Sequence, residues 1–285
     1  MKKIAVLLTV FNRKEKTLAC LDLLKKQELP INVNLDIYIT DGGSSDGTVG
    51  EVKLKYPYVD IEIVDDVYWN QGMLCSWKRA VSQGEYDFFL WLNDDTFIYA
   101  DCVGALLKAS ESMHNNAIVT GSCVDTKTKR KLTYGGRDAT GAVAGTTADD
   151  TPVRVQMING NIVLVPNAVY KKVGMLDNYF THARGDFDYG LRAKAIGLEM
   201  WQVGHPLGEC DLHDRIDKWC DPTIPFLKRW KLMHKPNGMP PNEIFHLENR
   251  HYGFFIAIMH FFTIYVRCIF PMLWIKLGKA KLSND

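Results

Sequence analysis

Two adjacent carboxylates follow an apolar run near the end of the chain's first third. Residues 88–92 read Phe-Phe-Leu-Trp-Leu, a pattern typical of a buried strand, and Asn93, Asp94 and Asp95 come directly after it. Adjacent carboxylates in such a place repel each other and cost stability unless a cation lies beside them. Strand ends of open α/β sheets are also where ligands bind. The pattern favours a divalent metal with a phosphate behind it; the alternative is one helix-capping and one solvated aspartate.

A second polar segment follows another apolar stretch. Residues 40–48 read Thr-Asp-Gly-Gly-Ser-Ser-Asp-Gly-Thr, so Asp41 stands at an expected strand end and Gly43 allows a tight turn. A carboxylate there can accept hydrogen bonds from a nucleobase N–H or from ribose hydroxyls. The segment is not a phosphate-binding P-loop, because the Gly-Lys-Ser/Thr ending is missing. The alternative is an ordinary turn with Asp46 as the N-cap of the next helix.

Further candidate residues stand at the end of the first expected strand and at the start of a helix. They are Thr9, Phe11, Asn12 and Arg13 after that strand, and Asn70 and Gly72 at the helix start. The first group occupies the crevice where an open sheet binds its ligand. A helix-capping role for Asn12 explains that residue equally well.

The elements that must position these residues alternate along the first half of the chain. Strands are expected at 4–9, 35–40, 61–64 and 88–92, and helices at 14–26, 70–81 and 101–113. The alternation predicts a mostly parallel sheet with helices on both faces. After a region of short strands and a long loop (120–154), a strand at 161–165, helices at 167–173 and 186–196 and a strand at 199–203 follow.

Composition narrows the class of protein. The 285 residues carry a net charge of +1, which gives no reason to expect nucleic acid as a partner. The seven cysteines are scattered and never spaced Cys-x-x-Cys, which argues against a disulfide framework or a zinc ribbon and for a reducing compartment. The apolar run at 4–10 is short for a signal peptide. A cytoplasmic location is therefore expected.

Residues 254–275 are strongly apolar and aromatic, but His260, Arg267 and Pro271 interrupt them. Arg250 precedes the run, and lysines follow it as far as residue 281. Three interpretations remain open: an interfacial helix that brings 254–281 to an anionic membrane surface, a helix packed on the domain or on a second subunit, and a membrane span. The oligomeric state stays open for the same reason.

The ordered set of motifs resembles the family 2 glycosyltransferases of the GT-A fold. Thr-x-Phe-Asn-Arg, then Asp-Gly-Gly-Ser-Ser-Asp-Gly-Thr, Asn-x-Gly and Leu-Asn-Asp-Asp follow one another at the family's spacing, over most of residues 3–215. An asparagine in place of the first acid of the Asp-x-Asp-type motif is a feature of the rhamnosyl- and galactosyl-transferase-like branches. The resemblance implies a Rossmann-like α/β catalytic domain over 1–225, with a donor half to 115 and an acceptor half from 116, followed by an apolar helical tail over 226–285.

The resemblance also implies roles in donor binding. Asp41 would contact the base, Asp95 would ligate Mn²⁺ or Mg²⁺, and Asp94 would contact the ribose or a water. The family often has a late histidine near the metal or the diphosphate, which here would be His213, with His205, Asp211 and Asp214 as rivals. A lone histidine is as often purely structural.

Residues 185–192, Gly-Asp-Phe-Asp-Tyr-Gly-Leu-Arg, resemble the segment that supplies the family's catalytic base. By that match Asp186 is the base at a helix N-terminus, where a charged carboxylate is favoured. Asp188 and Arg192 would then lie on the acceptor side. The alternative is that Asp186 caps the helix and Asp188 pairs with Arg192.

The expected activity is metal-dependent, inverting transfer of a sugar from a UDP- or dTDP-linked donor to a hydroxyl of a glycan or lipid-linked acceptor. One alternative is a nucleotidyltransferase. Such an enzyme requires a glycine-rich phosphate loop after the first strand, and Thr9–Arg13 has no glycine. The second alternative is a non-catalytic protein with the same fold that binds a nucleotide or a glycan.

Overall fold

The computed structural model describes residues 1–211 and 217–276, and the chain divides into two compact units. The first comprises Met1–Asn178 and Gly185–Leu212, and the second comprises Tyr179–Arg184 and His213–Asp285. The second unit therefore begins nearer the N-terminus than the tail expected from residue 226. The division of the first unit into donor and acceptor halves stays a prediction.

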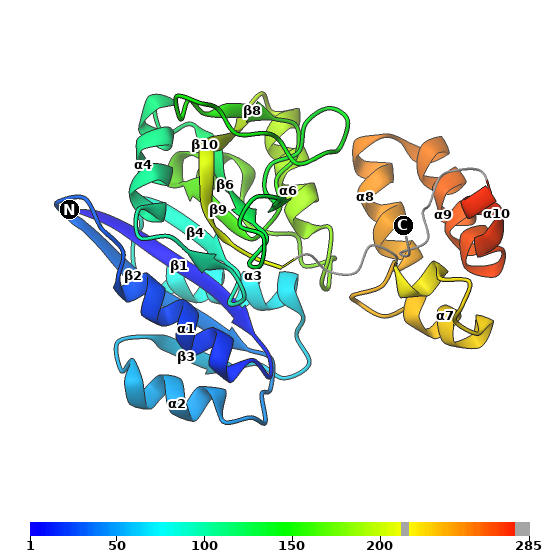
Figure 1. Cartoon of the computed structure of the whole chain (residues 1–285), viewed down its shortest axis with the longest axis horizontal. Coiled ribbons are helices and arrows are strands. Elements are labelled where there is room, and N and C mark those ends of the chain that lie inside the picture. The colour runs from blue at the N-terminus through cyan, green and yellow to red at the C-terminus, as the bar shows by residue number, and fades with distance from the viewer. Residues whose placement is uncertain (212–216, 277–285) are drawn as a thin grey trace. The chain divides into compact units, whose positions relative to one another are not determined.

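A ten-stranded sheet forms the centre of the first unit (Figure 1). Its strand order is β3-β2-β1-β4-β9-β6-β10-β5, with β7 paired to β6 and β8 paired to β10. The strands are β1 (Lys2–Val10), β2 (Val33–Asp41), β3 (Asp60–Ile63), β4 (Phe88–Leu92), β5 (Phe97–Ile98), β6 (Ala117–Val124), β7 (Leu132–Tyr134), β8 (Val153–Val155), β9 (Ile162–Pro166) and β10 (Glu199–Glu209). The four strands β3, β2, β1 and β4 are mutually parallel, whereas β9 is antiparallel to both of its neighbours.

Helices cover both faces of this sheet, as the alternation of elements predicts. They are α1 (Lys14–Lys25), α2 (Thr48–Lys55), α3 (Trp69–Gln83), α4 (Cys102–Ser112), α5 (Asn167–Val173) and α6 (Gly185–Ala195). Successive residues of a strand point to opposite faces, so β1 serves two cores. Ile4, Val6 and Leu8 pack with α1 and α4, while Ala5 and Leu7 pack with α3 and α6. Burial on both faces explains why β1 reads as an unbroken apolar run.

The register of the parallel strands brings three loops to one edge of the sheet. Val10 pairs with Asp41 at the ends of β1 and β2, and Leu7 pairs with Trp91 near the end of β4. Because parallel strands end at the same edge, the segments that follow β1, β2 and β4 gather there. These segments carry Thr9–Arg13, Asp41–Gly43 and Asn93–Asp95.

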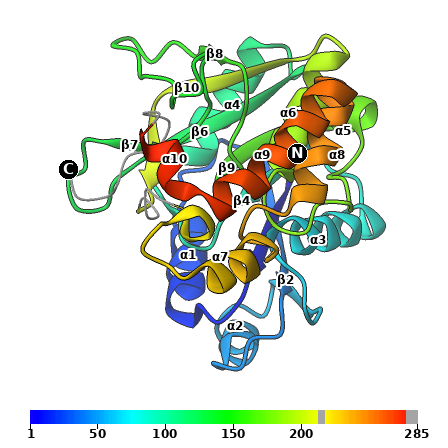
Figure 2. The ribbon, with the colours of Figure 1, turned by 90° about the vertical axis from the view of Figure 1, so that its right-hand side faces the viewer.

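The second unit contains the 3₁₀ turn η1 (Lys218–Cys220) and the helices α7 (Phe226–Met233), α8 (Pro241–His251), α9 (Phe254–Ile269) and α10 (Pro271–Lys276) (Figures 1 and 2). Trp219, Met233, Ile244, Ile264 and Cys268 form its small core. The residue before a proline is driven out of the helical region, which ends α9 before Pro271. Over residues 1–211 and 217–276, no helix has both the length and the apolar character needed to span a bilayer.

Candidate active site

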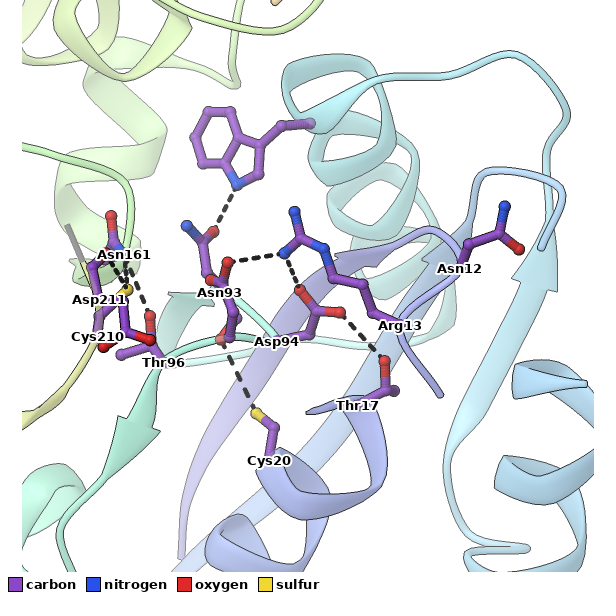
Figure 3. A network of polar contacts seen from close by, with 12 residues as sticks. Asn12, Arg13, Thr17, Cys20, Asn93, Asp94, Thr96, Asn161, Cys210 and Asp211 are labelled. Atoms are coloured by element: carbon purple, nitrogen blue, oxygen red, sulfur yellow. Dashed lines mark hydrogen bonds and ion pairs between the residues drawn. The ribbon is translucent and has the colours of Figure 1, made fainter. Parts of the chain in front are cut away.

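A guanidinium lies between the two adjacent carboxylates at the end of β4. Asp94 and Asp95 are only 2% and 8% exposed. Arg13 Nη1 donates to Asp94 Oδ1 at 2.9 Å and to Asp95 Oδ2 at 2.8 Å, and Thr17 Oγ1 donates to Asp94 Oδ2 at 3.1 Å (Figure 3). Figure 3 shows Arg13 reaching Asp94 from the loop that follows β1. The cation that the sequence requires beside this pair is therefore supplied, in this structure, by Arg13.

Asn93 is held by a tryptophan that the sequence did not single out. Its Oδ1 accepts a hydrogen bond from Trp69 Nε1 at 2.6 Å, and its backbone N–H donates to the carbonyl of Asn161 at 3.1 Å. A Cβ on Gly160 would lie 2.4 Å from the Trp69 ring, so the segment before β9 must approach the indole closely. Trp69 at the start of α3 thus holds the Asn93 side chain, and the segment before β9 holds the Asn93 backbone.

The Asp41 carboxylate is completely buried, and only one of its two oxygens accepts hydrogen bonds. Its Oδ1 accepts hydrogen bonds from the N–H groups of Gly43 at 3.0 Å and Ser44 at 2.7 Å, and Gly43 has the φ of +93° that this turn requires. Asp41 Oδ2 and Thr9 Oγ1 have no hydrogen-bond partner within the described part of the chain. Buried polar atoms are rarely left unsatisfied, so two such atoms at the ends of the adjacent strands β1 and β2 mark a place for a ligand.

The loops after β1 and β2 are fastened to each other. Asn12, at a φ of +48°, donates its backbone N–H to Ser44 Oγ at 2.8 Å and accepts at Oδ1 from the Ser45 N–H at 2.8 Å. Its side chain does not cap α1; instead Asp46 Oδ2 accepts the Lys14 N–H at the start of that helix. Phe11 remains 54% exposed beside this turn. Asn12 and Asp46 therefore fix the shape of the loops around Asp41.

Asn70 and Gly72 begin α3 in closely packed surroundings. A Cβ on Gly72 would lie 2.0 Å from Thr9 Oγ1, so only glycine lets α3 approach β1 here. Asn70 is fully buried and donates through Nδ2 to the carbonyl of Asp177 at 2.8 Å. Both residues thus position neighbouring parts of the site, and direct donor contacts by them stay predictions.

Asp186 stands at the N-terminus of α6, 8% exposed. Its Oδ2 accepts the N–H of Gly160 at 3.0 Å, and its Oδ1 accepts the N–H of Phe187 at 2.8 Å. Backbone donors at a helix N-terminus stabilise a negative carboxylate. Since Gly160 is followed by Asn161, whose carbonyl accepts the Asn93 N–H, one short segment contacts both Asp186 and the acidic stretch.

Asp188 and Arg192 form a buried ion pair. Asp188 is completely buried, and Arg192 Nε donates to its Oδ2 at 2.7 Å. The remaining guanidinium nitrogens donate to the carbonyls of Val173 at 2.7 Å and Met175 at 2.8 Å. The pair therefore fastens the segment after α5 to α6, the arrangement that the structural alternative described; a contact of either residue with the acceptor stays a prediction.

The similarity of this chain to known proteins agrees with the geometry. The family model described as Glycosyl transferase family 2 matches residues 5–171, which is more than half of the chain. The chain belongs to glycosyl transferase family 2. No curated protein sequence matches it. The enzyme class predicted from the ordered motifs is confirmed: the protein is a glycosyltransferase.

Solved glycosyltransferase structures share its fold. The S. aureus protein TarS, residues 1–349 in complex with UDP-GlcNAc, matches with a TM-score of 0.56 and 13% identity over 90% of this chain and 72% of TarS 1–349. GalNAc-T7 with UDP, GalNAc and Mn²⁺ matches with a TM-score of 0.54 and 12% identity over 74% of this chain and 45% of that one. The predicted GT-A fold is thereby confirmed.

The acidic pair of this glycosyltransferase suits a hard divalent cation. Carboxylate oxygens are the ligands that Mg²⁺ and Mn²⁺ prefer, and the pair already holds one cationic group, Arg13. In residues 1–211 and 217–276, no cluster of three or more His, Cys, Asp or Glu side chains has the geometry of a complete metal site. His213 lies outside the described residues, and the rival His205 pairs with Asp101 and Asp150 instead.

Three residues in the site went unnoticed in the sequence: Thr17, Trp69 and Gly160. Thr17 lies one helical turn beyond Arg13, a spacing that places both on one side of α1. Trp69 is adjacent to the Asn70–Gly72 motif. Gly160 carried no signal, because only the tertiary structure sets its N–H against Asp186.

Burial makes the charge of Asp94 costly. Burial raises the pKa of this carboxyl from its ordinary value of 3.8 to about 6, while Arg13 opposes the rise and Asp95 adds to it. The folded state therefore holds a proton that the unfolded state has lost, and the free energy of unfolding falls as pH rises from about 4 to about 7. This component amounts to about 3 kcal/mol.

Asp94→Asn should remove that pH dependence, because the amide can still accept from Arg13 and bond Thr17 without ionising. Urea unfolding of both proteins between pH 4 and pH 7 measures it: the wild-type curve should fall more steeply with pH than the variant's. Parallel curves would contradict the assignment of the raised pKa to Asp94.

Asp188→Ala should lower the free energy of unfolding by about 3 kcal/mol, because it leaves the Arg192 cation without its buried counter-charge. Glu51→Ala is a matched control, since Glu51 and Lys55 form an ion pair with the same i,i+4 spacing on an exposed helix face. The control should cost less than about 1 kcal/mol. Equal losses in chemical denaturation would show that the Asp188 pair contributes no more than a surface pair.

Proposed function

We propose that the enzyme transfers a sugar, with inversion, from a UDP- or dTDP-linked donor to an acceptor hydroxyl, with the help of Mn²⁺ or Mg²⁺. One observation carries the proposal: the buried, unpartnered Asp41 Oδ2 and Thr9 Oγ1 lie at the same sheet edge as the Asp94–Asp95 pair. An acceptor for a base N–H beside an anionic metal-binding pair is what a nucleoside diphosphate needs.

The base is a pyrimidine in this proposal. Asp41 Oδ2 accepts the N3–H that uracil and thymine share, and Thr9 Oγ1 bonds the adjacent carbonyl oxygen. The exposed ring of Phe11 offers a surface for stacking, and Gly43 lets the backbone approach the ligand. UDP in the similar TarS and GalNAc-T7 structures supports uridine over thymidine.

The diphosphate lies over the acidic pair. Asp95 would ligate the metal and Asp94 would bond the ribose or a metal-bound water. When bound, the ion supplies a Lewis acid that neutralises charge on the leaving diphosphate. Arg13, Asn12 and Asn93 would complete the donor contacts, together with Asn70 and Gly72.

Asp186 is the catalytic base of the proposed reaction. Its carboxylate accepts the backbone N–H groups of Gly160 and Phe187 at the N-terminus of α6, a position that favours the charged form, and in this proposal it accepts the proton of the acceptor hydroxyl. The acceptor oxygen, as it loses its proton to Asp186, attacks the anomeric carbon from the face opposite the diphosphate, which leaves. One displacement therefore inverts the configuration. Asp188 and Arg192 shape the acceptor side through the segment after α5.

The acceptor is a hydroxyl of a glycan or of a lipid-linked oligosaccharide. A lipid-linked acceptor requires the enzyme to work beside a membrane, and we infer a cytoplasmic protein that reaches the inner surface of the cell membrane. The free thiols of all seven cysteines agree with a reducing compartment.

Thermal unfolding with UDP, dTDP, CDP, GDP and ADP, each with and without Mn²⁺, tests the donor site. A ligand that binds only the folded state stabilises it by about 2.7 kcal/mol at one hundred times its Kd. We expect a metal-dependent rise in Tm with UDP or dTDP and none with the purine nucleotides. A well-folded protein whose Tm no nucleotide raises would overturn the proposal.

A further inference from the structure

Helix α9 of the second unit presents an apolar stripe to solvent. Phe255, Met259, Phe262, Val266 and Ile269 are between 37% and 85% exposed. They are spaced four, three, four and three residues apart, which places them along one face of a helix with 3.6 residues per turn.

The opposite face of α9 is already packed. Ala257, Ile264 and Cys268 are buried, and the last two join Trp219, Met233 and Ile244 in the core of the unit. The residues of the stripe are therefore not part of the core that stabilises the unit. The helices α7 and α10 contact α9 and carry further exposed apolar residues, as does the residue between α9 and α10: Phe226, Leu227, Trp230, Met272, Leu273 and Phe270. An exposed apolar surface of this extent marks a binding surface for a protein or a membrane.

The polar residues that interrupt the apolar sequence point away from the stripe. His260 Nδ1 lies 2.7 Å from Glu248 Oε1 of α8, and the Arg267 guanidinium lies over the Trp219 ring at 4.9 Å from its centroid. Arg229 of α7 is buried and donates to the carbonyl of Cys268 at 2.9 Å. The groups that would oppose contact with hydrocarbon are thus engaged inside the unit.

The charges exposed on these helices have one sign. The sequences of α7, α9 and α10 contain no aspartate or glutamate, and Lys228, Lys231 and Lys276 are exposed. Two copies joined through this face would bring like charges together, which costs free energy. An anionic bilayer surface offers both an apolar layer for the stripe and counter-charges for the lysines.

We propose that the second unit binds the surface of an anionic membrane, with α9 lying in the plane of the interface and its stripe at the boundary of the acyl chains. The lysines of α7 and α10 contact the lipid headgroups. The inference deepens the membrane location that is part of the proposed function, but it needs neither nucleotide nor metal, so its failure would leave the proposed sugar transfer standing.

Co-sedimentation of the full chain with vesicles tests the proposal. Vesicles of phosphatidylcholine containing phosphatidylglycerol should bind it much more tightly than vesicles of phosphatidylcholine alone, by about fivefold for each lysine near the surface. Added salt should weaken this preference, because it screens the exposed charges.

Two variants divide the contributions. Phe255→Glu combined with Phe262→Glu should weaken binding to anionic vesicles at least about tenfold, since both rings would otherwise enter the interface. Lys228→Glu with Lys231→Glu should abolish the preference for anionic lipid. The matched control, Ile31→Glu with Leu54→Glu, changes exposed apolar residues of the first unit and should bind as the wild type does.

Circular dichroism spectra and Tm values that match the wild type show that a variant is folded. If the aromatic variant does not fold, the lysine variant, which retains the stripe, still tests the proposal. Equal binding to neutral and anionic vesicles would overturn the proposal. So would vesicle binding that neither variant affects. A dimer in light scattering that the Phe255→Glu, Phe262→Glu variant dissociates, without any vesicle binding by the wild type, would assign the stripe to a second copy instead.

Discussion

Asp186→Asn is expected to lower kcat by about 1,000-fold while UDP or dTDP binds within about twofold of its wild-type affinity. Removing a general base costs between about 10²- and 10⁴-fold. An amide cannot accept the proton of the acceptor hydroxyl, but it has nearly the shape of the carboxylate. Single-turnover kinetics with the best donor, together with calorimetric donor binding, measure the two effects separately.

The same substitution has a structural cost that must be measured with it. The two Asp186 oxygens each accept a backbone N–H, from Gly160 and from Phe187, so an asparagine must set its own N–H groups against one of these donors. We expect a loss of about 1–3 kcal/mol in the free energy of unfolding from the unmet donor. Donor binding that disappears along with turnover would show that Asp186 supports the site rather than acting as the base.

Asp41→Asn is expected to weaken UDP binding by about 100-fold and to improve CDP binding relative to UDP. The N–H groups of Gly43 and Ser44 fix which way the new amide lies, because its oxygen must face them. The amide nitrogen then occupies the place of Oδ2 and opposes the N3–H of uracil. The amide N–H then faces the N3–H of uracil, so a charge-assisted hydrogen bond worth about 1.5–3 kcal/mol is lost and the two donors repel each other.

Cytosine supplies the internal control for this prediction, because its N3 is an acceptor and would pair with the amide N–H. Titration calorimetry of the wild type and the variant with UDP and CDP, at one concentration of Mn²⁺, gives four affinities to compare. An equal loss for both nucleotides would mean that Asp41 shapes the loop and does not read the base.

Much of the first unit could be predicted from local patterns. The apolar runs gave the strands because a strand buried on both faces must be apolar throughout, and β1, β2 and β4 lie within a few residues of their expected bounds. The expected helix at 101–113 is α4, and the expected helix at 186–196 is α6. By contrast β10 was expected to end at residue 203 but continues to Glu209. The sequence leaves the order from Pro206 onward open; in the structure Pro206 pairs with Ser122 of β6, and Gly208 pairs with Cys123 of β6 and Ile98 of β5.

The sequence by itself determined where carboxylates end apolar strands, and hence that Asp41 and the Asp94–Asp95 pair meet at one sheet edge. This follows from the two-residue period of strands and the shared direction of parallel ones. Only the tertiary structure decided what neutralises each buried charge. Arg13 reaches Asp94 from 81 residues away, and the Gly160 N–H donates to Asp186 from 26 residues away. The partner of a buried charge is chosen by packing between distant segments, and no local pattern encodes it.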